Sequence, residues 1–270
     1  MRIEIASEIV AIFRRWNTKL LRQPIFLFFS LIQPLVWFLL FTQAFSAIGN
    51  LAIPQPGGPV KTFKDITGTS SYITFFTAAV IIQTIASSAL QAGIGLVNDF
   101  DSGFLDKMRV APISKSAILF GKLFSDAIST MIQVVIILLI GLALGVSIAS
   151  GILGVFMILA IAATFGMAWS GISLFVALTS KSSQTTLSVG LLTTFPLLFL
   201  SASVMPLELL PSWVQQVAKA NPFTYIAQVF QNLIIKGFVW DSIGYAFVAI
   251  LVIGTMSLGA SILVFRKKVS

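Results

Sequence analysis

The stretch SSYITFFTAAVIIQTIASSALQAGIGLV, residues 70–97, decides the fold of this chain. No charged residue interrupts it, and at about 1.5 Å of rise per residue such a helix is longer than the ~30 Å hydrocarbon core of a bilayer. Inside lipid every backbone amide must find its partner within the segment, which a helix achieves and an isolated strand does not. The stretch is therefore predicted to be a transmembrane helix.

Five further apolar runs lie on either side of this helix. Polar breaks separate them, among them the PQPGGP turn at residues 54–59, whose Pro and Gly residues are typical of a loop. Together the runs predict six transmembrane helices, at about residues 25–48, 70–97, 115–149, 151–178, 184–204 and 242–265. The expected fold is an all-α membrane protein whose transmembrane domain covers residues 24–270.

The composition supports a membrane protein and excludes several kinds of chemistry. Hydrophobic residues make up 57% of the chain, charged residues 10%, and the mean hydropathy is +0.99, against roughly 45–50% apolar and about 25% charged residues in soluble domains. The chain has no Cys and no His, which excludes disulfides, Cys/His zinc sites and His acid–base catalysis. No metal and no cofactor is therefore expected on this chain.

The net charge is +8, and the placement of the basic residues predicts the orientation in the membrane. Thirteen of the seventeen gather at residues 2–22, 107–122, 181 and 266–268, in alternation with the apolar runs, and the other four, Lys61, Lys64, Lys219 and Lys236, lie in the intervening segments. The positive-inside rule places these clusters and both termini in the cytoplasm. The same alternation indicates a multi-pass protein in contact with membrane lipid rather than a protein that binds nucleic acid.

Two segments outside the six helices have patterns of their own. In residues 1–23, apolar side chains from Ile5 to Leu20 share one helical face and charged side chains from Glu4 to Arg22 another, which predicts an amphipathic interfacial helix. A solvated helix that precedes the membrane is the alternative. In residues 205–241, prolines and isolated charges predict short helices in an outer, partly re-entrant segment outside the core, with a soluble outer loop as the alternative.

Two sets of polar residues lie inside the predicted transmembrane helices. The first recurs at helical spacing as Thr77, Thr84, Ser88 and Gln91. This polar stripe is a candidate substrate route or a helix interface. In the second set, Asp126 follows Lys122 by one turn. Because a carboxylate within a bilayer costs about 2.5–3.5 kcal/mol on insertion scales, we expect Asp126 to pair with Lys122 or to reach interfacial water, in a structural role rather than in proton transport.

An unusual segment, NDFDSGFLDKMRVAPISKSAILFGK, joins the second and third predicted helices at residues 98–122. Acidic and apolar residues alternate in it, and a Gly and a Pro bracket a short amphipathic helix at about residues 99–112. One face is apolar enough to dock on another protein, and the charges could set the register of docking. The candidate contact residues are Asp99, Asp101, Gly103, Phe104, Leu105, Asp106, Lys107, Arg109 and Pro112.

The sequence resembles the type 2 ABC-transporter permeases in three features. The first is the block DSGFLDKMRVAPIS at residues 101–114, followed by the pair Gly121 and Lys122. The second is LPSWVQQVAKANPFTY at residues 210–225, and the third is the plan of an amphipathic leader, six spans and inner termini. One departure is visible, since the family often has an Arg where this chain has Gln231.

The resemblance implies a function and a set of partners. Residues 99–112 would form a cytoplasmic coupling helix that sits in a cleft of a separate ATP-binding subunit. Two copies of that subunit, which would carry ATP and Mg, and a second permease copy, identical or similar, are expected. The implied location is the plasma (inner) membrane of a prokaryote. The implied activity is export of an amphipathic drug or lipid-like substrate, or alternatively of a lipid-linked polysaccharide or glycolipid.

The residues themselves argue against an enzyme. The only Gly-Lys pair, Gly121 and Lys122, has Ser116 where a phosphate loop of the form GxxxxGK requires Gly, so ATP hydrolysis is expected from the partner. A membrane enzyme would need a catalytic arrangement at mid-membrane that the sequence does not offer. An ion-coupled carrier or channel is a further alternative, disfavoured because the predicted spans hold almost no ionisable residue near their centres.

Overall fold

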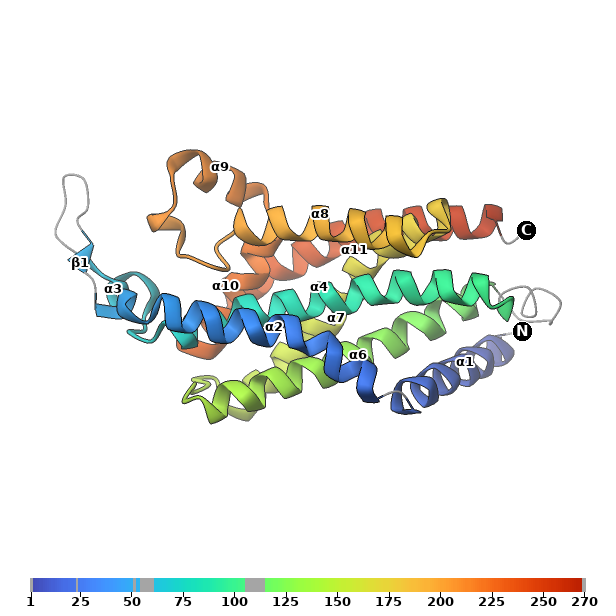
Figure 1. Cartoon of the computed structure of the whole chain (residues 1–270), viewed down its shortest axis with the longest axis horizontal. Helices are drawn as coiled ribbons and strands as arrows, with labels where there is room; N and C mark the ends of the chain where they lie inside the picture. Colours follow the sequence, from blue (N-terminus) through green and yellow to red (C-terminus); the bar gives the residue numbers. More distant parts are fainter. Residues whose placement is uncertain (1, 23, 51, 54–60, 105–114, 269–270) are drawn as a thin grey trace.

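The computed structural model describes residues 2–22, 24–50, 52–53, 61–104 and 115–268. This part of the chain is almost entirely helical, and its long helices run along one common axis (Figure 1). The elements in chain order are α1 (Arg2–Arg22), α2 (Pro24–Ala44), η1 (Ser46–Asn50), β1 (Ala52–Ile53), β2 (Lys61–Thr62), α3 (Phe63–Thr67), α4 (Tyr72–Asp101), α6 (Lys115–Ala143), α7 (Gly151–Ser180), α8 (Ser183–Phe199), η2 (Leu207–Leu209), α9 (Ser212–Ala220), α10 (Pro222–Ile235) and α11 (Trp240–Lys268).

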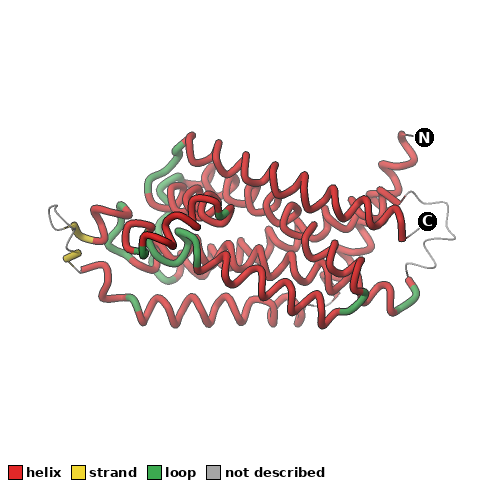
Figure 2. Tube along the Cα trace, turned by 90° about the horizontal axis from the view of Figure 1, so that it is seen from above, coloured by secondary structure: helices red, strands yellow, loops and turns green. Residues whose placement is uncertain are grey.

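Four of these helices contain stretches long and apolar enough to cross a membrane. They are α4, the part of α6 from Ala117 to Ala143, α7, and the part of α11 from Trp240 to Phe265. Two further apolar helices, α2 and α8, pack against α4. The small β1–β2 sheet and α3 lie at the end of the molecule opposite the two chain termini (Figure 2). We call these the distal end and the terminal end.

Three predicted helices end earlier than expected. The predicted helix at residues 184–204 stops at Phe199. The predicted helix at residues 25–48 stops at Ala44, and the chain continues as the tighter η1 helix. The predicted helix at residues 115–149 stops at Ala143, because Gly145 adopts a left-handed φ of 92° and the Val146 N–H donates to the Gly141 carbonyl at 2.9 Å. This is the Schellman arrangement, which closes a helix with Gly just beyond its end.

Helix α4 lies at the centre of the bundle, with 89% of its most apolar stretch buried, against 6% for α11. Small residues let its neighbours approach closely. A Cβ on Gly93 would lie 2.7 Å from the Ser173 carbonyl oxygen of α7, and a Cβ on Gly171 would lie 2.8 Å from the Leu258 nitrogen of α11. Ser257 of α11 also donates to the Ala168 carbonyl of α7 at 2.6 Å. Close backbone approach and interhelical hydrogen bonds from hydroxyl groups commonly stabilise helix packing in lipid.

Residues 205–241 contain the short η2 helix, the helices α9 and α10, and the start of α11. The predicted position outside the core is wrong for α10. Phe223 and Phe230 are fully buried in the main hydrophobic cluster. Asn221 fixes the start of α10: its Oδ1 accepts from the Phe223 N–H at 3.0 Å, and its Nδ2 donates to the carbonyls of Leu197 at 2.6 Å and Leu200 at 2.8 Å. The Asn-Pro pair thus caps α10, with Pro at its first position, and ties it to the end of α8.

Candidate functional site

The segment expected to contact a partner begins where α4 ends, at the terminal end of the molecule. The structure describes it from Asp99 to Phe104. Helix α4 ends at Asp101, and Gly103, two residues later, has a left-handed φ of 66°. The predicted contact residues Leu105, Asp106, Lys107, Arg109 and Pro112 lie outside the described residues, so the short helix assigned to them stays a prediction.

A second hydrophobic cluster surrounds the root of this segment. Its buried members are Ile12, Leu96, Val97, Ala117, Ile118, Leu119, Leu123, Leu174, Ala177, Leu178 and Phe265, contributed by α1, α4, α6, α7 and α11. Phe100 and Phe104 pack against it, partly buried. Five helices therefore share one apolar cluster at the point where the chain leaves α4.

Helix α1 joins this cluster by packing tightly on α6. A Cβ on Gly121 would lie 2.8 Å from Ile12 Cγ2 and 3.1 Å from the Ile9 carbonyl oxygen, so only glycine fits there. The guanidinium of Arg15 lies 3.3 Å from the centre of the Phe104 ring, a cation–π contact. Burial lowers the pKa of Arg15, and the nearby carboxylate of Asp99 opposes that shift. Helix α1 thus contacts both α6 and the segment that follows α4.

At the terminal end of the molecule, Lys122 and Asp99 are buried, and Lys122 is paired with the carboxylate of Asp126. The predicted pairing of Asp126 with Lys122 is confirmed, since Lys122 Nζ lies 3.2 Å from Asp126 Oδ2 and donates to Oδ1 at 3.3 Å. Lys122 is 3% exposed, and its ammonium lies 4.3 Å from the centre of a Trp16 ring. Asp99 is also 3% exposed. Pairing with Asp126 offsets the cost of burying the Lys122 ammonium.

The predicted polar stripe of α4 divides into two halves. Thr77 and Thr84 are fully buried, and their hydroxyls donate to carbonyls one turn earlier in the same helix. Ser88 instead shares a 2.8 Å hydrogen bond with Thr130 of α6, and Gln91 lines a cavity. The first half therefore lies at a helix interface, and the second half reaches a space that a ligand could enter.

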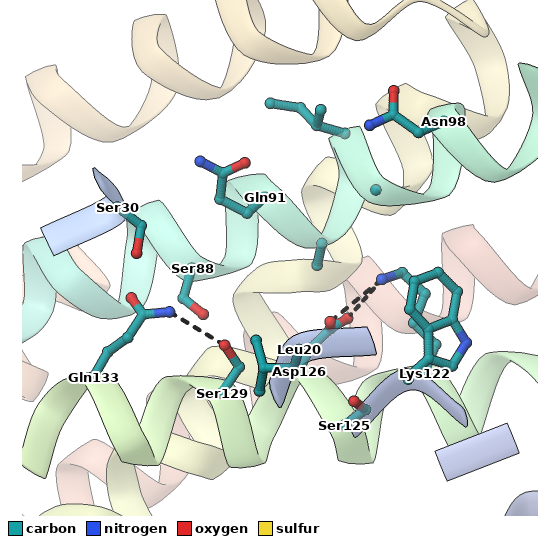
Figure 3. A pocket seen from close by; sticks show the side chains of 14 residues that line it. Leu20, Ser30, Ser88, Gln91, Asn98, Lys122, Ser125, Asp126, Ser129 and Gln133 are labelled. Atoms are coloured by element: carbon teal, nitrogen blue, oxygen red, sulfur yellow. Dashed lines mark hydrogen bonds and ion pairs between the residues drawn. The ribbon is translucent and has the colours of Figure 1, made fainter. Parts of the chain in front are cut away.

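That cavity has a volume of about 300 Å³ and lies between α1, α2, α4 and α6 (Figure 3). Its polar lining comes from Ser30, Ser88, Gln91, Asn98, Lys122, Ser125, Asp126, Ser129 and Gln133, with Trp16 and Leu20 of α1 on one wall. Gln133 is 3% exposed and donates from Nε2 to Ser129 Oγ at 3.2 Å. Within the described chain its Oε1 is buried without a hydrogen-bond partner.

Sequence reasoning missed the α6 side of this cavity. Ser125, Ser129 and Gln133 recur every four residues, which places them on one face with Lys122 and Asp126. That spacing was visible in the sequence, but only the two charged residues were singled out. Within the described residues no group of three or more His, Cys, Asp or Glu side chains could hold a metal ion.

Four long apolar helices, two of which line a cavity with polar side chains, define a multi-pass membrane protein. The family described as ABC-2 type transporter matches residues 7–235. The chain belongs to this family, and it is a transport permease of the ABC type, as the resemblance implied.

Individual relatives agree with this assignment. A protein described as transport permease ycf38, from Porphyra purpurea, is 31% identical over 224 residues, which is 82% of this chain and 72% of the relative. The daunorubicin resistance ABC transporter permease protein DrrB1 of Streptomyces coeruleorubidus is 27% identical over 220 residues, 81% of this chain and 72% of the relative. A multidrug ABC transporter permease of Escherichia coli, YbhR, is 24% identical over 190 residues, 70% of this chain and 51% of the relative.

Proposed function

We propose that this permease is the transmembrane subunit of an ATP-driven exporter that moves an amphipathic drug or lipid-like substrate out of the cytoplasm or the inner leaflet. The observation that carries the proposal is the second hydrophobic cluster, which binds α1, α4, α6, α7 and α11 together where residues 99–112 begin. A push on that segment would reach five helices at once. The names of two relatives, for daunorubicin resistance and multidrug transport, favour this class of cargo.

The proposed topology has six crossings, by α2, α4, α6, α7, α8 and α11, with α1 in the interface and residues 24–270 as one transmembrane domain. An even number of crossings returns the chain to its starting side, which agrees with the position of both chain ends at one end of the bundle (Figure 1). The basic residues of α1 and of residues 107–122 and 266–268 favour the cytoplasm for that end. The membrane would be the plasma (inner) membrane of a prokaryote.

Coupling would proceed through residues 99–112 docked on an ATP-binding subunit. A partner shifts a conformational equilibrium only through contacts that differ between the two states. Two such subunits, loaded with ATP and Mg, would close on each other and move the docked segments of two permease copies. Helix α4 is the central helix of the bundle, so it would carry that movement into the membrane.

A lipid-linked polysaccharide or glycolipid is the second candidate cargo. The observation that favours it is the cavity between α1, α2, α4 and α6, whose polar lining residues are mostly uncharged hydroxyl and amide groups. Hydroxyl-bearing headgroups would find many hydrogen-bond partners there.

The test is transport by this permease and its ATP-binding subunit, reconstituted together in liposomes. Daunorubicin and a fluorescent phospholipid serve as probes, with ATP hydrolysis measured in parallel. We expect transport that requires ATP, and we expect Asp106→Lys and Gly103→Pro to abolish transport while ATP hydrolysis and membrane insertion persist. Normal export by both variants would contradict the coupling role. Transport that persists without ATP and stops when the proton gradient collapses would indicate an ion-coupled carrier instead.

A further inference from the structure

The cavity between α1, α2, α4 and α6 holds a buried acceptor that no described group satisfies. Gln133 uses its amide nitrogen on Ser129, which leaves its Oε1 as an acceptor without a partner. Figure 3 shows this amide at one end of the cavity, close to Ser30 and Ser88. Because a buried acceptor without a donor is costly, the site calls for a molecule that donates a hydrogen bond at this point.

The charges of the cavity disfavour a charged ligand. Lys122 and Asp126 already neutralise each other at 3.2 Å, and Lys122 also covers the Trp16 ring. A cationic ligand would meet the Lys122 ammonium, an anionic ligand would meet the Asp126 carboxylate, and a zwitterion would have to break the pair. The remaining polar groups of the lining are Ser hydroxyls and side-chain amides, which both donate and accept hydrogen bonds without charge.

The depth of the cavity fits the headgroup of an amphiphile. Lys122 and Gln133 lie at its two ends along α6, which corresponds to about 16 Å of helix, or about half of a ~30 Å hydrocarbon core. Leu20 and Ile94 give apolar surface to the wall. A volume of about 300 Å³ stands at the lower limit of small-molecule sites, roughly 300–1,000 Å³, so it suits a headgroup rather than a whole lipid.

We propose that this cavity binds the uncharged, hydroxyl-bearing headgroup of an amphiphile, such as a glycosyl or polyol headgroup. Gln133 Oε1 has almost no accessible surface in this structure, so the Gln133 amide would turn to accept a hydrogen bond from a ligand hydroxyl. Gln91 would contact the same headgroup from α4. The proposal concerns binding alone and does not depend on ATP-driven export. A molecule of this kind could be the cargo or a resident lipid, since both offer the same chemistry to the site.

Binding is tested on the full-length permease alone, in nanodiscs of dioleoyl phosphatidylcholine. Each nanodisc preparation contains a small equal share of dioleoyl monoglucosylglycerol, dioleoyl phosphatidylglycerol and dioleoyl phosphatidylethanolamine. Native mass spectrometry then counts which lipid stays on the released protein. We expect the glucolipid to be retained preferentially over the anionic and zwitterionic lipids. Equal retention of all three lipids, or preference for either of the other two, would overturn the proposal.

Two variants locate the site and one controls for the loss of a buried amide. Gln133→Leu should weaken glucolipid retention about three- to tenfold, the worth of one hydrogen bond. Gln91→Leu should weaken it as well, and because Gln91 is only partly buried this variant keeps the test valid if Gln133→Leu misfolds. The matched control is Gln83→Leu, since Gln83 is 5% exposed with a partnerless amide nitrogen in the described chain, on a separate cavity of about 20 Å³. Unchanged retention in Gln133→Leu and Gln91→Leu, or equal loss in the control, would contradict the assignment.

A second arm distinguishes cargo from resident lipid. The permease is reconstituted with its ATP-binding subunit, and ATP hydrolysis is measured with and without the glucolipid. Stimulation that Gln133→Leu abolishes would identify cargo, whereas retention without stimulation would identify a resident lipid. Both results support the binding site. A failure of ATP coupling in this arm would count against the proposed function and leave the binding measurement intact.

Discussion

The Lys122–Asp126 pair shows how a short spacing fixes a contact. Residues four apart on a helix face each other, and opposite charges at that spacing attract. The sequence alone therefore predicted this pair, and the structure has it at 3.2 Å. The contacts of Asn221 could not be predicted in this way, because they join residues 21 and 24 positions apart in different helices. The free oxygen of Gln133 depends on its side-chain conformation, which no spacing reveals.

Removal of one partner of the Lys122–Asp126 pair should destabilise the protein more than removal of both. Asp126→Asn leaves the buried Lys122 without its anion, at an expected cost of about 3 kcal/mol. The double variant Lys122→Met with Asp126→Leu removes both charges and should recover most of that loss. Unfolding by denaturing detergent, followed by circular dichroism, measures the difference. A double variant as unstable as Asp126→Asn would show that the ion pair is not what the single change disrupts.

The Asn221 cap should contribute substantially to stability. Asn221→Ala removes a capping bond and two bonds to α8, leaving two carbonyls to find other donors, with an expected loss of about 2–3 kcal/mol. Asn98→Ala is the control, because Asn98 is exposed and its side chain accepts one long bond of 3.4 Å from Ser183. The same unfolding measurement applies. Similar losses for the two variants would refute the clamping role of Asn221.

The sequence predicts the positions of the helices better than it predicts where they end. Long apolar runs predict helices in a membrane because lipid offers no other partner for the backbone, and α4, α6, α7 and α11 occur where such runs were identified. The end of α6 depended on the conformation of Gly145, one glycine among several in that stretch. The burial of α10 was missed, since its apolar pattern suits a core position and an interfacial position equally well.

The packing of α1 on α6 should depend on the absence of a side chain at residue 121. Gly121→Leu would place a side chain inside Ile12, so α1 should separate from α6, at a cost of about 1–3 kcal/mol. The chain has no Cys, so spin labels on cysteines introduced at Ala11 and Phe124 report the distance between the two helices. We expect a longer and broader distance distribution.

The matched control for this substitution is Gly244→Leu, because a Cβ on Gly244 meets no atom within 4 Å. It should leave the α1–α6 distance unchanged. An unchanged distance in Gly121→Leu would mean that α1 does not rest on this contact.

The short helix α3 should lose its start in acid. The Thr62 N–H and hydroxyl both donate to the Asp65 carboxylate, which lowers the pKa of Asp65. A carboxyl whose folded pKa is lowered stabilises the fold above its unfolded pKa of about 3.9, and the contribution disappears as the pH falls through the folded value. Hydrogen exchange of the Asp65 amide, corrected for intrinsic rates, should therefore accelerate below about pH 4. Asp65→Asn removes the titrating group and should remove this pH dependence at the residue 65 amide, and its persistence there would assign it to another group.

At the scale of the whole molecule, composition predicts the class of protein, whereas packing decides how deeply each helix is buried. Composition and two sequence blocks were enough to predict a helical membrane protein of the ABC-2 type, and the family match agrees. They did not reveal that one helix would be buried almost throughout its most apolar stretch while another would have only 6% of that stretch buried. That contrast arises because α4 packs against α2, α6, α7, α8 and α10, a neighbourhood that no single segment encodes.

The proposed topology predicts which surfaces face the two sides of the membrane. Ser102 is exposed at the terminal end and Trp213 is exposed on α9. Single cysteines at these positions, treated with a membrane-impermeant maleimide, should react on opposite sides. Ser102→Cys should label in inside-out vesicles and Trp213→Cys in right-side-out vesicles. The proposed topology has three crossings between them, by α6, α7 and α8, so labelling of both from one side would require an even number and would contradict it.

The serine contacts of α7 carry a mechanical consequence. Ser173 donates to the Ala89 carbonyl of α4, and Ser257 and Ser261 of α11 donate to carbonyls of α7 at 2.6 Å. Glycines at the same crossings bring the helices so close together that one helix has no room to slide past the next. Helices α4, α7 and α11 would therefore move as one rigid body during the transport cycle. Any hinge is then expected where α2 and α8 pack against that body.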